Sequence, residues 1–313
     1  MSAGLLLKLL AVFAVIGVGW LSGRLRVLGP GAATTLGAAA FGVFTPALLF
    51  RTTAHVDLAK LPWATIVAYY GPTVVLMFAA YAWQRLRHPP RPEVPAVRAL
   101  SLSFSNTVQL GIPVATALFG PAGLTLHLAL ASLQALVLLT TGTMLAEVGR
   151  STGRWVGAAL VTLRRAFIHP VVLPILLGLA FNASGLPIPG PVDDVLVTLG
   201  QAVVPVSLVT IGLTLAQYGV AGTAGRAVTT ALGKLVVQPA AVFPVAYWLL
   251  GLRGLPLTVA VMCAALPIGA NVLLFAQRYE VLEAEVTGAI VTSTVAYLVT
   301  GTLWLLLLTH LAA

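Results

Sequence analysis

The sequence predicts an all-α polytopic membrane protein with ten transmembrane helices in two inverted five-helix repeats, of which helices 4 and 9 are broken. Three observations predict this fold. The chain is 59% hydrophobic and only 8% charged, whereas about 25% of the residues of a soluble domain are charged. Its apolar stretches approach or exceed the roughly 20 residues that a helix needs to cross a bilayer. Gly, Pro and Asn interrupt two of these stretches, at corresponding places in the two halves.

The expected spans of the first half cover residues 5–23, 33–50, 62–83, 97–119 and 122–146. The first span resembles a signal peptide in its length and apolar composition. However, Lys8 is its one basic residue, it has no clear small-x-small cleavage site, and Arg24 and Arg26 follow it. We therefore expect it to be retained as a helix. The linker at 85–93 is basic and rich in proline, and it is too short for a soluble domain.

The expected spans of the second half cover residues 166–183, 194–217, 226–250, 255–277 and 284–309. With ten spans, both termini lie on one side of the membrane, together with Lys8, Arg51, Lys60 and Arg253. The other side holds thirteen basic residues: Arg24, Arg26, Arg85, Arg87, Arg91, Arg98, Arg150, Arg154, Arg164, Arg165, Arg226, Lys234 and Arg278. The positive-inside rule places this second set in the cytoplasm and both termini outside. The net charge of +9 therefore reports topology rather than nucleic-acid binding.

Proline positions indicate an internal repeat. Pro46 in span 2 and Pro205 in span 7 are 159 residues apart, and Pro113 in span 4 and Pro267 in span 9 are 154 apart. A five-span unit used twice explains both offsets, with residues 1–150 and 151–313 as the two copies. Because five is odd, the second copy is inverted in the membrane. The alternative is chance, since membrane helices are generally rich in Gly and Pro.

The two interruptions are the best candidates for a binding site. They contain Asn106, Gly111 and Pro113 in span 4, and Pro267, Gly269 and Asn271 in span 9. Paired broken helices point to a transporter's substrate site. Their half-helix N-termini favour an anion, and the amides of Asn106, Asn271 and Gln109 can add neutral hydrogen bonds. Ordinary interhelical hydrogen bonding is the alternative for these amides, and for Gln109 the two readings are equally good.

The carboxylates lie at span ends or in loops, and none lies deep in a span. Proton- and sodium-driven carriers often use a deep carboxylate, so this pattern argues against such a coupling site. The chain also lacks a nucleophile-elbow or metal-ligand spacing, and we expect no enzyme activity, metal or cofactor. The single cysteine, Cys263, excludes an internal disulfide and a Cys-based zinc site.

Four polar residues within or at the start of spans need an explanation. Lys234 lies about two turns inside span 8, where it either snorkels to the interface or has a charge or coupling role. His127 in span 5 is interpreted as a packing histidine, and His169 as an interfacial one. Gln134 is a polar group in an apolar run, so either a ligand or another helix must satisfy it.

Particular motifs are similar to those of the auxin efflux carrier family, which includes the plant PIN-type carriers. The stretch 101–107, Gly111-Ile112-Pro113 and Phe119-Gly120 resemble the fourth-helix motif of that family. The stretches 251–254, 265–269 and 275–279 resemble its eighth-to-ninth-helix segment. The similarity covers both halves, and hence nearly the whole chain.

The resemblance implies ten helices in inverted repeats, related to the fold of the bile-acid sodium symporters. It implies a scaffold of helices 1, 2, 6 and 7, a transport domain of helices 3–5 and 8–10 with crossed helices 4 and 9, an elevator motion and a homodimer. It also implies that Asn106 and Gln134 are substrate ligands. Lys234 stands at a position that resembles a basic one in PIN-type relatives.

Two departures from the PIN-type pattern stand out: Val272 replaces a proline after the ninth-helix glycine, and the long cytoplasmic loop is absent. The chain therefore resembles a compact prokaryotic member, for which the resemblance implies small organic acids such as malate or malonate.

We expect a secondary carrier of a small organic anion in the lipid bilayer of a bacterial inner membrane. A sodium-coupled symporter of bile-acid type and a membrane receptor that does not transport are the alternatives.

Overall fold

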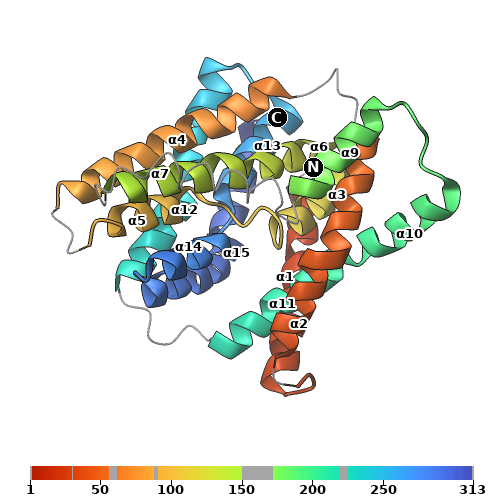
Figure 1. The fold of residues 1–313 in the computed structure, drawn as a ribbon, viewed down its shortest axis with the longest axis horizontal. Coiled ribbons are helices and arrows are strands. Elements are labelled where there is room, and N and C mark those ends of the chain that lie inside the picture. The colour runs from red at the N-terminus through yellow and green to blue at the C-terminus, as the bar shows by residue number, and fades with distance from the viewer. Residues whose placement is uncertain are drawn as a thin grey trace.

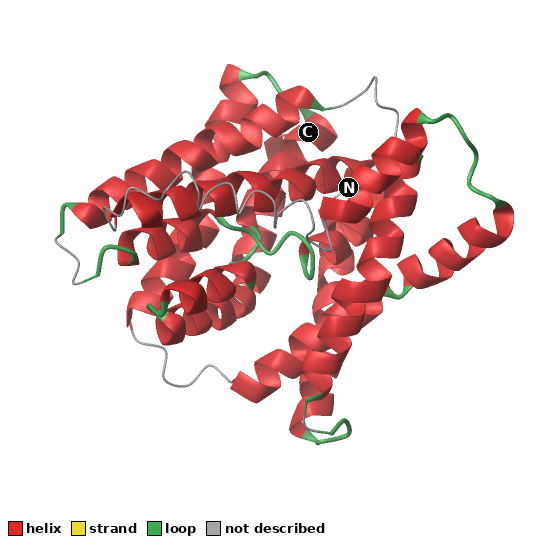
Figure 2. Ribbon diagram, viewed as in Figure 1, coloured by secondary structure: helices red, strands yellow, loops and turns green. Residues whose placement is uncertain are grey.

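The computed structural model describes residues 2–29, 31–55, 62–87, 91–149, 172–218 and 225–311, and these residues form helices joined by short connections (Figure 2). Within this described part, β structure is limited to one isolated bridge. Six helices are long and apolar enough to cross a membrane, and three shorter apolar helices accompany them. The structure therefore agrees with an all-helical membrane protein.

The first half begins with α1 (Ser2–Arg24). A second long helix consists of α2 (Ala32–Ala39), a π-helical turn (Ala40–Phe44) and α3 (Thr45–Ala54). It is followed by α4 (Trp63–Arg85), α5 (Val94–Ser103) and α6 (Gly111–Gln134), which continues through a π-helical turn (Ala135–Leu139) into α7 (Thr140–Gly149). Within α6, Gly120 has a φ of 64° and a ψ of −161°, and Pro121 follows it. Glycine tolerates this conformation, and the two arms of α6 separate there, at the expected boundary between spans 4 and 5.

The second half contains α9 (Val172–Ala183), α10 (Gly190–Gln201) and α11 (Val203–Tyr218). Then come α12 (Gly225–Pro244) with a π-helical turn (Val245–Leu249), α13 (Gly254–Ala265), α14 (Asn271–Tyr279) and α15 (Glu283–Leu311). The boundary between the expected repeats, the start of span 6 and His169 lie outside the described residues, as do Asp57 and Lys60.

The helices gather in two groups (Figure 1). The helices α1, α2, α3, α9, α10 and α11 pack with one another on the right of the view. The helices α4, α5, α7, α12, α14 and α15 lie on the left, with α13 and α6 between the groups. The main core lies in the second group and extends to α13, and both α5 and α13 are buried on nearly all sides. A helix that is apolar all round is the kind that such a core buries.

Small residues allow the closest helix contacts in the first group. A Cβ atom at Gly212 of α11 would lie 2.1 Å from the carbonyl oxygen of Ile16 in α1, and one at Gly19 would lie 2.4 Å from that of Val209. In the same way, a Cβ at Gly178 of α9 would lie 2.5 Å from the carbonyl oxygen of Phe50 in α3. Backbones can approach this closely only where side chains are absent, as is common between helices in membranes.

Candidate functional site

Two interrupted helices meet at the centre of the molecule. The helix α5 ends at Ser103 and α6 begins at Gly111, while α13 ends at Ala265 and α14 begins at Asn271. The intervening residues, 104–110 and 266–270, form what we call the crossing. Here Ser105 and Ile268 form an antiparallel bridge. Both predicted interruptions are therefore present in the structure, and they lie against each other.

Each interruption satisfies backbone groups of the other. The N–H of Asn106 donates to the carbonyl oxygen of Pro267 at 2.7 Å, and the N–H of Gly269 donates to that of Phe104 at 3.0 Å. Apolar surroundings make an unpaired buried backbone group costly, and inside a bilayer water cannot replace the missing partner. The pairing explains how two broken helices can persist together.

The predicted glycines and prolines shape the crossing. Pro267 disfavours a helical conformation for the residue before it, and α13 ends there with Leu266 at a ψ of 151°. A Cβ at Gly269 would lie 2.9 Å from the carbonyl oxygen of Ser105, and one at Gly111 would lie 2.6 Å from Nε2 of His127. Pro113 lies in the first turn of α6, where its missing N–H costs little.

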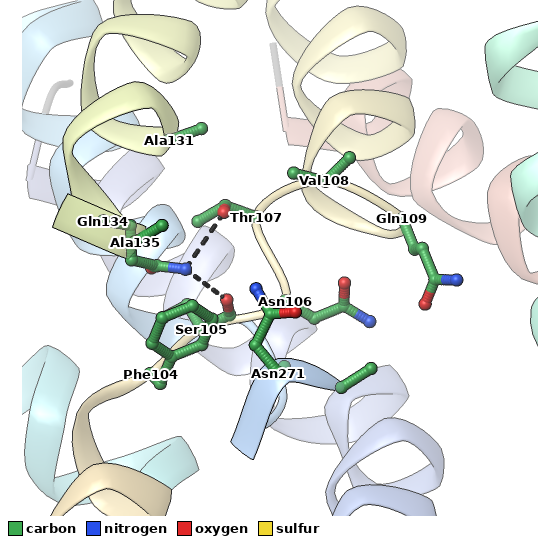
Figure 3. Close-up of a pocket in the computed structure, with 12 residues that line it drawn as sticks. Phe104, Ser105, Asn106, Thr107, Val108, Gln109, Ala131, Gln134, Ala135 and Asn271 are labelled. Carbon is green, nitrogen blue, oxygen red and sulfur yellow. Dashed lines mark hydrogen bonds between the residues drawn. The ribbon is translucent and has the colours of Figure 1, made fainter. Parts of the chain in front are cut away.

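A buried amide and a buried imidazole hold the first interruption from α6. Nε2 of Gln134 donates to the carbonyl oxygen of Ser105 at 2.7 Å and to Oγ1 of Thr107 at 3.1 Å, and its Oε1 accepts from the Tyr69 hydroxyl at 3.0 Å (Figure 3). Nε2 of His127 lies 2.7 Å from the carbonyl oxygen of Thr107. A carbonyl can only accept, so this nitrogen carries the hydrogen. Both side chains therefore have structural partners.

Two polar residues of α12 approach the crossing from another direction. Lys234 has no exposed surface, and its Nζ donates to the carbonyl oxygens of Ala264 at 2.7 Å and Leu266 at 2.5 Å. Gln238, also fully buried, donates from Nε2 to the carbonyl oxygen of Ser103 at 3.0 Å. The interpretation of Lys234 as a snorkelling residue is therefore wrong, because its ammonium ends inside the protein rather than at an interface.

A small pocket opens at the crossing. It is lined by Phe104, Ser105, Asn106, Thr107, Val108, Gln109, Ala131, Gln134, Ala135, Gly269, Ala270 and Asn271. Its empty volume is about 410 Å³, part of which is open to the outside. Figure 3 shows Gln134 reaching the loop from one side, while Asn106 and Gln109 extend from it toward the other and Asn271 lies beneath.

The amide of Asn106 is the most informative group in this pocket. The residue is 9% exposed, and within the described part of the chain its side chain makes no hydrogen bond. Buried polar groups are normally satisfied, so an unpaired amide facing a pocket indicates a place for a ligand. Asn271 adds a second amide at the first residue of α14.

The electrostatics of the pocket favour an anion. The helix α14 begins at the lining residue Asn271, and α6 begins at Gly111, two residues after the lining residue Gln109. The first N–H groups of α6 already donate within the chain, that of Gly111 to the carbonyl oxygen of Asn106 at 3.0 Å and that of Ile112 to that of Val108 at 3.3 Å. Both helix ends still carry partial positive charge, which favours a carboxylate or phosphate. Neither Asp nor Glu lines the pocket. Among the described residues, no group of three or more His, Cys, Asp or Glu side chains could hold a metal ion.

The structure brings together four of the predicted site residues, Asn106, Gln134, Gly269 and Asn271, as lining residues of one pocket. Gly111, Pro113 and Pro267 form the adjoining backbone, and Lys234 lies behind the crossing and does not line the pocket. The sequence interpretation missed Tyr69, Gln238 and Ser293. Each is a buried polar residue of an apolar helix, which was the available signal.

The carboxylates that the structure describes lie away from the pocket, as expected. Three of them pair with other elements: Asp193 with Arg51 at 2.7 Å, Glu285 with Arg98 at 3.0 Å, and Glu147 with the hydroxyl of Tyr279 at 3.0 Å.

Comparisons with known proteins also point to a membrane transporter. The model of a family described as "Membrane transport protein" matches residues 5–305. A protein of Methanothermobacter thermautotrophicus named "Uncharacterized transporter" is 26% identical over 301 residues, which cover 94% of this chain and 95% of that protein. A protein of Rhizobium meliloti (strain 1021) named "Putative malonate transporter" is 30% identical over 170 residues, which cover 52% of each chain.

Proposed function

The chain belongs to the membrane transport protein family, the auxin efflux carrier family of the sequence resemblance, and we propose that it is a secondary transporter of a small organic anion. The membrane location and the transporter class follow from the family and from the apolar helices. The family also indicates that the chain is not an enzyme. The substrate, its site and the mechanism are our proposal.

One observation carries the proposal: the unpaired amide of Asn106 lines a pocket that has no carboxylate, with the N-terminus of α14 in its lining and that of α6 two residues beyond it. An anion bound there would accept hydrogen bonds from the amides of Asn106 and Asn271 and would lie near the partial positive charge of both helix N-termini. Gln134, whose polar atoms already have partners, would keep the loop that carries Asn106 in place. Its amide could contact the anion only by exchanging one of those partners.

A carboxylate is the substrate class that we propose. A carboxylate is planar, carries one charge and accepts several hydrogen bonds, which suits amides and helix N-termini. The relative named as a malonate transporter supports small dicarboxylates such as malonate or malate as first candidates. An auxin-like monocarboxylate is the next candidate.

The helix arrangement supports ten spans in two inverted repeats. A helix or pair of helices stands at each of the ten expected segments. The two close helix pairs of the first group are α1 with α11 and α3 with α9. They correspond to spans 1 and 7 and to spans 2 and 6. A five-span repeat maps span 1 onto span 6 and span 2 onto span 7, so it exchanges the two pairs. Corresponding irregularities also precede the paired prolines: the π-helical turn before Pro46 and the interruption at Ala202 before Pro205.

The mechanism that we propose is alternating access of the elevator type. The helices α1, α2, α3, α9, α10 and α11 would form a fixed scaffold. The helices α4–α7 and α12–α15, with the crossing, would move the bound anion across the membrane. We propose that the carrier works as a homodimer in the inner membrane, with both termini on the extracytoplasmic side.

Counterflow in proteoliposomes tests the transport function. Vesicles preloaded with unlabelled malonate should accumulate labelled malonate above equilibrium, and a panel with malate and indole-3-acetate should identify the preferred anion. Solid-supported-membrane recordings on the same vesicles would show whether net charge moves. Saturable anion binding without counterflow would contradict transport and favour a receptor.

A further inference from the structure

The helix α12 places two buried polar side chains, one turn apart, on the carbonyl ends of both broken helices. Lys234 donates to the carbonyl oxygens of Ala264 and Leu266 at the end of α13. Gln238 donates to that of Ser103 at the end of α5, and also to Oγ1 of Thr73 in α4. The crossing is thus polarised: its N-terminal helix ends face the pocket, and its carbonyl ends face α12.

The two contacts differ in charge. A neutral amide is enough for α5, whereas α13 receives an ammonium group. The last carbonyls of a helix lack partners within it and carry partial negative charge, so both donors are favourable. A lysine deep in a membrane is nevertheless costly, by roughly 2.5–3.5 kcal/mol on insertion scales. Gln238 shows that a neutral donor can satisfy such an end.

The ammonium of Lys234 is held by backbone oxygens. Among the described residues, no carboxylate forms an ion pair with it, and its hydrogen-bond partners are the two carbonyls. In secondary carriers, the carbonyl ends of broken helices are a typical place for a coupling Na⁺. The ammonium therefore shares with such an ion two carbonyl ligands and the position at a helix C-terminus.

We propose that Lys234 is a tethered cation that takes the place of a coupling sodium ion at the end of α13. Two consequences follow. First, the natural chain carries its anion without sodium, because the cation position is already filled. Second, removing the side chain beyond Cβ opens a site for a monovalent metal cation at the carbonyls of Ala264 and Leu266. The first consequence rests on the proposed transport function, whereas the second does not.

Thermal unfolding of Lys234→Ala in detergent, without any anion substrate, tests the cation site. At equal ionic strength, replacing choline chloride by sodium chloride should raise its Tm saturably, whereas the natural chain should show no sodium-specific rise. Gln238→Leu is the matched control. It removes the neutral donor one turn away, so its Tm should fall equally in both salts. A Lys234→Ala protein that sodium fails to stabilise would overturn the proposal.

Uptake by the natural chain gives a second test that does not depend on the folding of a variant. Labelled malonate uptake into proteoliposomes, driven by counterflow, should proceed at the same rate in sodium and in choline. A rate that requires sodium would contradict the tethered cation. Failure of uptake in both salts would instead contradict the proposed function, and the Tm measurement would still decide whether Lys234 occupies a cation site.

Discussion

Asn106 and Gln134 both line the pocket, yet their amides have different surroundings. The amide of Gln134 is engaged on both its nitrogen and its oxygen. The amide of Asn106 is nearly as buried but has no partner among the described residues. A group with no partner in the protein is free to bind a ligand, whereas a fully engaged group fixes the residues around it. We therefore propose that Asn106 binds the anion and that Gln134 positions the loop that carries it.

Gln134→Leu should impair both folding stability and anion binding. The substitution removes one hydrogen bond each from the carbonyl of Ser105 and the hydroxyls of Thr107 and Tyr69. The Ser105 carbonyl keeps the N–H of Thr107 at 2.9 Å, and the Tyr69 hydroxyl keeps Oγ of Ser105 at 3.3 Å. The Thr107 hydroxyl loses its partner, and a buried polar group left unpaired costs about 1–3 kcal/mol, so thermal melts in detergent should show a lower Tm. Malonate affinity should fall as well, because the loop that carries Asn106 is released. A Tm equal to that of the natural chain would contradict the positioning role.

At the scale of residues, the sequence predicted the pocket better than the roles within it. The glycines, prolines and asparagines of the interruptions were identifiable because they stand out in apolar spans. The two carbonyl partners of Lys234 were not identifiable, because the spacing of residues along α12 does not tell which face of that helix meets the crossing. For the same reason Tyr69 and Gln238, which hold the crossing from α4 and α12, could not be predicted.

Among the elements, the two broken helices depend on each other. Their extended residues exchange backbone hydrogen bonds, and side chains of α4, α6, α12 and α15 supply further partners. A single interruption would leave its freed N–H and C=O groups unpaired in an apolar interior. This requirement explains why the interruptions occur as a pair, one in each half of the chain.

Gly269→Ala should force the two interruptions apart. The added Cβ would lie 2.9 Å from both the carbonyl oxygen of Ser105 and the ring of Phe104. One of the two interruptions must therefore shift, and the hydrogen bond from the N–H of Gly269 to the carbonyl oxygen of Phe104 must weaken. We expect a lower Tm and reduced malonate counterflow.

Gly71→Ala is the control for this substitution, because nothing lies within 4 Å of a Cβ at this position of α4. It should leave the Tm unchanged or raise it, since Ala favours a helix over Gly by about 0.5–1 kcal/mol. Equal effects of the two substitutions would contradict the proposed importance of this close contact.

The helical character of the chain was largely predictable, since part of every expected span is helical among the described residues. The length of each apolar run and its bounding glycines and prolines suffice for that. The irregular turns were not predictable: the π-helical turns in the second, fifth and eighth spans depend on packing against neighbouring helices, which the sequence pattern does not report.

For the whole molecule, the position of the crossing suggests how the carrier would work. The crossing belongs to the group of helices that contains α4, α5, α12 and α15, and α6 connects this group to α1 and α11 of the other (Figure 1). A movement of one group past the other would carry the pocket with it. The close, glycine-lined contacts within the first group suit a body that stays rigid during that movement.

Cysteine labelling in intact cells should verify the proposed orientation. Ser184 between α9 and α10 and Val27 between α1 and α2 are both exposed, and the proposed topology places them on opposite sides. The native Cys263 is buried, and the natural chain gives the background labelling. Above that background, Ser184→Cys should react with an impermeant maleimide from outside. Val27→Cys should react only after permeabilisation. The reverse pattern would place both termini in the cytoplasm.

The affinity of the purified protein for malonate, compared with that of Asn106→Ala, is the most direct test of an anion site at the crossing. Titration calorimetry in detergent should show saturable binding to the natural chain and at least about a tenfold loss in the variant, as expected when one charge-assisted hydrogen bond is removed. The Tm of the variant should stay unchanged, because the amide has no partner in the protein. Unchanged affinity in a folded Asn106→Ala protein would contradict the site.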